Sequence, residues 1–258
     1  MTANADAVYD TDYHHELRGR FGNALAGTKF TEGHGEKPRT PSEYSFSNIF
    51  PWGDIQEGEE YKVIVASEHE ELLTVIAEDV QATPEFHIGE MSFTVTDVAP
   101  AEADVGEPGT QGVLTTASGV LVRIYDDEYD TYGINPDGDP PYRCWEESYP
   151  LEPFIDKIEK NLAWKHEYFA PDYLPSPVET GYPLFDEYDL IKTYGLDMEV
   201  TSGTVVTYIV SKWHLGYEVR DDNHRRHLNL ALNTGIGQRN GMGLGFVNEQ
   251  APEEVYGQ

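Results

Sequence analysis

The sequence predicts an α+β protein in two similar halves, and two observations carry that prediction. Helical stretches with one apolar face alternate with short β-type stretches, and each half runs in the order of a split β-α-β unit. A turn-rich segment, residues 126–145, separates the halves. The chain has 258 residues, 39% of them hydrophobic, which suffices for a core in each half. We therefore expect a first domain over residues 1–135 and a second over residues 145–258.

The first half is expected to begin with a helix and to continue with strands around a second helix. Asp12 can cap the first helix, in which Leu17 and Phe21 recur on one face. Ser67 and Glu70 form a capping box that opens the second helix. The expected elements are a helix over residues 13–25, a strand over 61–67, the helix after Ser67, a strand over 86–98, and one or two strands within 113–125.

The second half repeats this arrangement. Pro153 fits the first turn of a helix that runs to about Phe169, since a helix does not use the backbone N–H that proline lacks there. Asp222 or Asn223 can cap a later helix that ends near Asn233. The expected strands are 196–201, 204–212 and 245–248. The predicted fold is thus two tandem ferredoxin-like (βαββαβ, RRM-like) domains with a C-terminal glycine-rich loop.

The composition is strongly acidic yet rich in aromatic residues. Asp and Glu number 47 against 17 Lys and Arg, for a net charge of −30, alongside 17 Tyr, ten Phe and four Trp. So many aromatic residues argue against a disordered acidic chain. A well-cored protein with an acidic surface is typical of a halophile that keeps molar salt in its cytoplasm, because charge maintains solubility there. The alternative is an acidic mesophilic binding module, whose acidity would be local.

Several classes of protein and site are excluded by what the sequence lacks. Cys144 is the sole cysteine, so neither an intramolecular disulfide nor a thiolate metal cage is possible. There is no apolar run long enough to cross a membrane, and the N-terminus has no signal-peptide pattern. We expect a cytoplasmic protein that contacts no membrane and needs neither a metal nor a cofactor.

Positive charge is concentrated in two segments. Residues 18–39 and 212–239 together hold ten basic and five acidic side chains, whereas the other 208 residues hold seven basic and 42 acidic ones. Retention of positive charge in so acidic a chain indicates an anionic partner. The basic residues of the two segments are Arg18, Arg20, Lys29, Lys37, Arg39, Lys212, Arg220, Arg225, Arg226 and Arg239.

Five glycines stand within eleven residues near the C-terminus, after a basic helix and before the last strand. A phosphate-binding P-loop is excluded because no Lys-Ser/Thr pair follows, and the helix-loop-strand order does not fit a dinucleotide fold. Alternating glycines let a backbone approach an anionic chain, and Arg239 can pair with a phosphate. A plain turn would need only one or two glycines. The five are Gly235, Gly237, Gly241, Gly243 and Gly245.

The glycine segment resembles a motif of a known family. Gly-hydrophobic-Gly, five residues, and Gly-hydrophobic-Gly again resembles the signature loop of the CRISPR repeat-processing endoribonucleases of the RAMP superfamily. Three further stretches are similar to that family, and the resemblance spans residues 13–248. They are the helix HHELRGRFGNALAG, the loop with His34 that runs into KPRTPSEYSFSNIF, and PFIDKIEKNLAWKHEYF. Two departures are the short opening strand, for which Ala7–Tyr9 is available, and Phe21 where several relatives have a tyrosine.

The resemblance implies a metal-independent endoribonuclease that cleaves precursor CRISPR RNA within its repeats to give guide RNAs. RNA carries its own nucleophile, the 2′-OH, so cleavage needs positioning, proton transfer and charge stabilisation. By resemblance His34 occupies the catalytic position, and histidine moves protons well near neutral pH. Lys37 or Arg39 would stabilise the phosphorane. The products would carry a 2′,3′-cyclic phosphate and a 5′-hydroxyl.

Other residues are candidates for RNA binding, and the histidines among them allow more than one interpretation. His224 and His227 could form a metal pair, but a basic RNA-facing helix is favoured. His14 and His15 are expected at the surface or helix end, where either could back up His34. The expected RNA-binding residues are Arg39, Lys212, Arg225, Arg226, Gly235, Gly237, Arg239, Gly243 and Gly245.

Expected partners are a precursor CRISPR RNA repeat and other CRISPR interference-complex subunits. The main alternative function is a non-catalytic RAMP subunit that binds CRISPR RNA in an interference complex. A ferredoxin-like metabolic regulator is a further alternative, which would not copurify with RNA.

Overall fold

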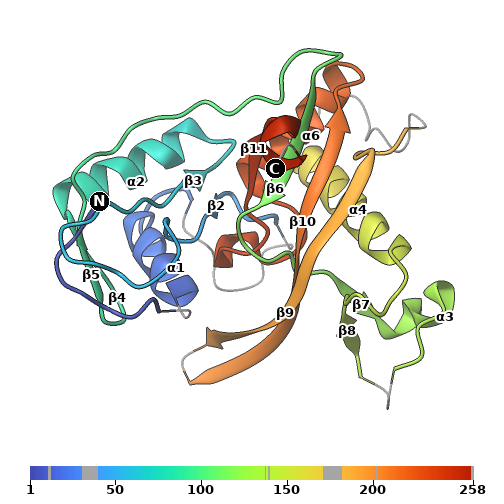
Figure 1. Cartoon of the computed structure of the whole chain (residues 1–258), viewed down its shortest axis with the longest axis horizontal. Coiled ribbons are helices and arrows are strands. Elements are labelled where there is room, and N and C mark those ends of the chain that lie inside the picture. Colours follow the sequence, from blue (N-terminus) through green and yellow to red (C-terminus); the bar gives the residue numbers. More distant parts are fainter. Residues whose placement is uncertain are drawn as a thin grey trace.

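The two halves of the chain lie side by side, the first drawn in blue to cyan and the second in green to red (Figure 1). The structure is a computed structural model. It describes residues 1–10, 13–30, 40–136, 138, 140–170, 182–201 and 203–256.

The first half is a small antiparallel sheet covered by two helices. Strands β1 (Thr2–Ala3), β5 (Met91–Thr94) and β4 (Glu85–Ile88) form the sheet in that order. Strands β2 (Ser45–Phe46) and β3 (Val65–Ala66) form a separate pair, and single bridges from Thr2 to Glu60 and from Ala7 to Ile55 connect the N-terminal stretch to the loop between β2 and β3. Helices α1 (Tyr13–Ala24) and α2 (Glu70–Ala82) supply the core residues Leu17, Phe21, Leu72 and Ile76.

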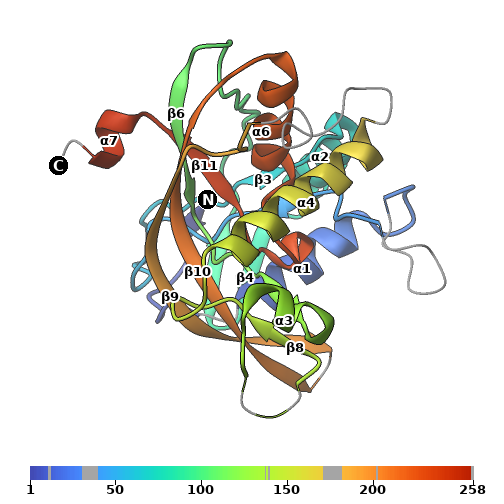
Figure 2. The same ribbon diagram turned by 90° about the vertical axis from the view of Figure 1, so that its right-hand side faces the viewer.

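The second half has the full ferredoxin-like strand order. Its sheet contains β11 (Val247–Gln250), β6 (Gln111–Thr116), β10 (Thr204–Glu218) and β9 (Glu187–Thr201), in that spatial order and antiparallel throughout. Helix α4 (Glu152–Phe169) follows β6, and α6 (Asp222–Thr234) follows β10. Both helices pack on the sheet through one apolar cluster that includes Phe154, Leu228 and Trp213 (Figure 2). The predicted α+β class is confirmed.

A long insertion separates β6 from α4. It carries the hairpin of β7 (Arg123–Tyr125) and β8 (Tyr142–Cys144), with a 3-10 turn at Asp126–Glu128 and the short helix α3 (Tyr129–Tyr132) between its strands. A second 3-10 turn, η2 (Asn240–Met242), lies in the glycine segment, and α7 (Pro252–Tyr256) follows β11.

Strand pairing changes the division of the chain into domains. The sequence prediction assigned residues 111–125 to the first domain, but β6 pairs with β10 and β11 of the second sheet. The turn-rich segment 126–145 therefore lies within the insertion of the second unit. We propose that the boundary lies in the acidic connector 95–110, which crosses from β5 to β6 (Figure 1).

The helices agree with the sequence prediction, while their caps and the strand lengths differ. Asp221, one residue earlier than expected, caps α6 by accepting the N–H of His224 at 2.8 Å. The capping box of Ser67 and Glu70 is wrong, because His69 is the N-cap of α2 and Ser67 Oγ donates to Glu43 O. Asp12 lies outside the described residues. Strands β9 and β10 are much longer than predicted, and the first strand is Thr2–Ala3.

Candidate functional site

A cleft of about 850 Å³ lies between the two halves. The first half contributes Arg18 within α1, Lys29–Phe30 after that helix, and Thr40–Tyr44 just before β2. The second half contributes residues from β7, one face of α4 and the glycine segment, including Gly237–Met242. A site built from both halves depends on how they pack together.

The cleft concentrates positive charge in an acidic chain. Among its described lining residues seven side chains are basic and one, Glu43, is acidic, whereas the whole chain has 17 basic and 47 acidic residues. Lys165 is buried, but the other six basic side chains give a surface that attracts an anionic ligand. The seven are Arg18, Lys29, Arg123, Lys157, Lys160, Lys165 and Arg239.

The predicted catalytic residues stand in sequence between two described residues that line this cleft. His34, Lys37 and Arg39 lie outside the described residues. Phe30 and Thr40, the described residues on either side of that segment, both line the cleft. Gly237–Met242 line the same cleft, so the glycine segment shares it with the two described residues that flank the segment of His34.

The glycines of the C-terminal segment are required by the protein's own packing. Gly235, Gly237, Gly243 and Gly245 all have positive φ angles, from 68° to 80°. A Cβ on Gly245 would lie 1.9 Å from Ile236 O, and one on Gly243 would lie 2.4 Å from the Phe46 ring. The close approach that sequence reasoning assigned to an anionic chain is therefore already made by protein atoms.

A buried lysine holds the glycine segment in place. Lys165 Nζ donates to Thr234 O at 3.0 Å, Gly235 O at 2.7 Å and Asn240 Oδ1 at 2.8 Å. Only 1% of Lys165 is exposed, and burial lowers the pKa of its ammonium to about 7. The three N–H bonds of the ammonium match these three acceptors. Lys165 thus fastens α4 to the end of α6 and to the segment that lines the cleft.

His14 fastens the other side of the segment. Its Nδ1 lies 3.0 Å from Met242 O, which can only accept, so this nitrogen carries the proton. The ring stacks on Tyr13 at 4.0 Å, and burial lowers the pKa of His14 to about 4. Of the two predicted alternatives, helix end is right for His14, the second residue of α1, and surface is wrong because its side chain is buried, whereas His15 is exposed. Apolar residues around the helix gave no sign that position 14 faces the second half.

Arg239 lines the cleft, but Lys212 does not. Arg239 has a left-handed φ of 61°, its guanidinium lies 5.3 Å from the ring centroid of Tyr208, and its Nη1 lies 3.2 Å from Met242 Sδ. Lys212, on β10, donates to Ala117 O at 2.9 Å. Of these two predicted RNA-binding residues, Arg239, within the glycine segment, is the one that lines the cleft.

The α6 residues predicted to contact RNA lie elsewhere. Arg225 donates to both Asp104 and Glu107 of the connector, and its hydrogen bond lowers the pKa of Asp104. His224 and His227 are buried, so these two side chains of the predicted basic, RNA-facing helix do not face a ligand. His227 is buried where α6 packs on α4 and stacks on His166 with ring centroids 4.0 Å apart, whereas His224 Nε2 lies 2.8 Å from Leu184 O.

Arg226 lines a separate, smaller cavity of about 240 Å³. That cavity also contains Glu68 and His166, and it shares no lining residue with the large cleft. Among the described residues, no group of three His, Cys, Asp or Glu side chains is placed to hold a metal ion. None of the described helices is long and apolar enough to span a bilayer.

Sequence reasoning missed the wall of the cleft that α4 and β7 provide. Lys157, Lys160, Asn161 and Trp164 recur at helical spacing on α4 and line the cleft, opposite the buried side chains of the helix. Arg123 of β7 joins them, 5.1 Å from the Tyr142 ring centroid, and donates from Nε to Gln238. The polar stripe of α4 was visible in the sequence, but what it faces depends on the packing of distant segments.

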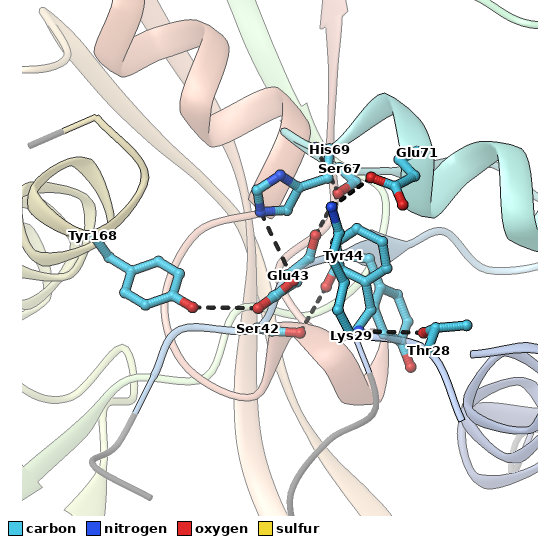
Figure 3. A network of polar contacts seen from close by, with 10 residues as sticks. Thr28, Lys29, Ser42, Glu43, Tyr44, Ser67, His69, Glu71 and Tyr168 are labelled. Atoms are coloured by element: carbon cyan, nitrogen blue, oxygen red, sulfur yellow. Dashed lines mark hydrogen bonds and ion pairs between the residues drawn. The ribbon is translucent and has the colours of Figure 1, made fainter. Parts of the chain in front are cut away.

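Glu43 connects the two halves at the edge of the cleft (Figure 3). Its Oε1 accepts from the Tyr168 hydroxyl of α4 at 3.2 Å, and its Oε2 lies 3.8 Å from His69 Nε2 at the start of α2. Its backbone oxygen accepts from Ser67 Oγ at 2.5 Å. This network holds the chain in place just before β2, on the C-terminal side of the segment that contains His34.

Comparison with known proteins identifies the family. Residues 104–249 match the family described as CRISPR associated protein Cas6, C-terminal. Over 248 residues the chain is 48% identical to the CRISPR-associated endoribonuclease Cas6 of Haloferax mediterranei, covering 96% of this chain and 91% of that protein.

Solved structures agree on the fold. A CRISPR associated protein Cas6 superposes with a TM-score of 0.67 at 13% identity, over 96% of each chain. A RAMP protein binding different RNA substrates superposes with a TM-score of 0.60 at 20% identity, over 96% of this chain and 98% of that one. The chain belongs to the Cas6 family of CRISPR-associated endoribonucleases.

Proposed function

We propose that this chain cleaves precursor CRISPR RNA within its repeats, without a metal, and releases guide RNAs. The observation that carries the proposal is the basic cleft between the halves, lined by Phe30, Thr40 and Gly237–Met242. A Cas6 relative at 48% identity, named an endoribonuclease, supports the same reaction.

The chemistry follows from the substrate. The 2′-OH attacks the adjacent phosphorus, the P–O5′ bond breaks, and the products are a 2′,3′-cyclic phosphate and a 5′-hydroxyl. In this proposal His34 transfers a proton in that step, and Lys37 stabilises the charge on phosphorus. Arg239 and Arg39 bind neighbouring phosphates, and the fixed glycine segment positions the scissile group.

Cleavage of a labelled repeat RNA tests the proposal. The wild-type protein is expected to cut it in EDTA and about 2 M KCl, and His34→Ala to lose roughly 10²- to 10⁴-fold in rate with RNA binding preserved. The matched control is His87→Ala, an exposed histidine on β4, which should cleave as the wild type does. Cleavage at the wild-type rate by His34→Ala would remove His34 from the mechanism.

The same assay separates the enzyme from a non-catalytic RAMP subunit. A protein that only coats guide RNA would bind the repeat and leave it intact under every condition. We also infer that the chain hands its product to other interference-complex subunits. Recovery of mature guide RNA together with identified CRISPR proteins on the tagged chain would support this step, and recovery of the chain with mature guide RNA but without any other CRISPR protein would contradict it.

A further inference from the structure

We propose that Trp164 is a specificity-determining residue that stacks on an unpaired RNA base in the cleft. The proposal rests on the proposed function, because it takes RNA as the ligand. It goes further by naming what the α4 side of the cleft binds. That ligand is a single-stranded stretch of the RNA, which the protein recognises through the faces of its bases.

Trp164 lies on the cleft-facing side of α4. The opposite side of that helix is core, with Phe154, Ile158 and Leu162 all fully buried. The cleft-facing side holds Lys157, Lys160, Asn161, Trp164 and Tyr168, which recur at intervals of three and four residues as one face of a helix requires. An aromatic ring among amines is the composition of single-strand binding surfaces, where rings stack on bases and cations track phosphates.

Trp164 differs from the other three tryptophans in its surroundings. Trp145 and Trp213 are buried, with 4% and 1% of their surface exposed. Trp52 is 63% exposed, but its ring packs at a tilt against Tyr9, with centroids 4.2 Å apart, and it does not line the cleft. Trp164 is 40% exposed and lines the cleft. Exposure of so large an aromatic surface in a concave basic site is typical of a binding residue.

Charge alone gives the α4 wall limited attraction for RNA. Lys157 is paired with Glu128, and Lys160 Nζ lies 2.6 Å from Asp156 Oδ2. Across the cleft, Lys29 is paired with Glu71. These lysines share their charge with carboxylates, and exposed charges are screened further as salt rises. Stacking of a base on an indole ring does not depend on counterions, so it holds RNA where phosphate contacts weaken.

Stacking on Trp164 selects for an unpaired base. In an A-form duplex both faces of a base are covered by its neighbours, so a side chain reaches a base face only at a loop, a bulge or a single-stranded flank. The α4 wall should therefore bind a single-stranded oligonucleotide and reject a blunt duplex of the same length. Sequence preference at this position should be weak, since every base has a face.

Tryptophan fluorescence tests the contact directly. In a His34→Ala/Trp52→Phe protein, which should cleave RNA slowly compared with the binding measurement, Trp164 is the exposed tryptophan of the described residues. Its emission should be quenched by a single-stranded RNA of about twelve nucleotides. An RNA of equal length with abasic sites throughout, which keeps the phosphates, should quench it little. Equal quenching by both RNAs, or by neither while RNA is bound, would overturn the proposal.

Affinity measurements supply the energetic test. Trp164→Ala should weaken binding of the base-bearing RNA roughly 5- to 100-fold, Trp164→Phe should restore most of it, and Trp52→Ala should bind as the wild type does. The effect of Trp164→Ala should persist from about 0.2 M to about 2 M KCl, whereas that of Lys160→Met should disappear. Wild-type affinity in Trp164→Ala with cleavage intact would overturn this inference and leave the proposed function standing. A wild-type protein that neither binds nor cuts RNA would overturn both.

Discussion

At the scale of single residues, His14 couples stability to pH. Burial lowers its pKa to about 4 from an ordinary value of 6.5, so between these pH values the unfolded chain binds a proton that the folded chain does not. The free energy of unfolding should therefore fall as pH drops from 6.5 toward 4, by up to about 3 kcal/mol from this group. Above pH 6.5 the full stability is present.

Denaturant unfolding at a series of pH values checks this prediction. His14→Gln, which keeps an N–H donor for Met242 O, should show a shallower loss of stability over the same interval. Some slope should remain in the variant, because burial also lowers the pKa of His227 to about 4. An unchanged slope in His14→Gln would show that His14 does not carry the effect.

Also at the residue scale, Gly245 is expected to matter more for the packing of the folded protein than for RNA binding. Gly245→Ala should lower the free energy of unfolding by at least about 2 kcal/mol, because its φ is 68° and the new Cβ would collide with Ile236 O. Gly19→Ala in α1 is the matched control, with nothing within 4 Å of its Cβ and an expected gain of about 0.5–1 kcal/mol. Full stability with reduced RNA affinity in Gly245→Ala would favour a direct contact with RNA instead.

At the scale of elements, local signals predicted the helices well and the site only in part. Pro153 and the apolar spacing that follows it placed α4 within a residue of its observed bounds. The same apolar pattern locates the core face but says nothing about what the other face meets. Trp164 and Lys160 were therefore missed, although they lie on a helix that was predicted correctly.

For the glycine segment, the sequence predicted the kind of role but not the reason for its glycines. A role for this segment in RNA binding was predicted, and Gly237–Met242 do line the cleft. The reason for its glycines was not, because the atoms they meet come from residues far away in sequence, such as Leu121 and Phe46. Likewise Lys165 lies 75 residues before its acceptor Asn240, a separation that no local pattern encodes.

At the scale of the whole molecule, the strand order predicts where the chain divides. A fragment of residues 104–256 keeps β6 between β11 and β10 and should fold with a cooperative thermal transition. A fragment of residues 136–256 loses this central strand, exposes two unpaired edges and should aggregate or stay unfolded. Circular dichroism and scanning calorimetry in high salt distinguish them. Cooperative folding of the shorter fragment alone would restore the boundary near residue 135.

The central claim is that the segment around His34 and the glycine segment converge on one phosphodiester. Photo-crosslinking from a thiouridine placed next to the scissile phosphate of a repeat RNA, followed by mass spectrometry of the peptides, tests it most directly. Crosslinks are predicted both in residues 31–39 and in Gly237–Met242. Crosslinks confined to the outer face of α6, where Arg225 meets Asp104, would contradict the account.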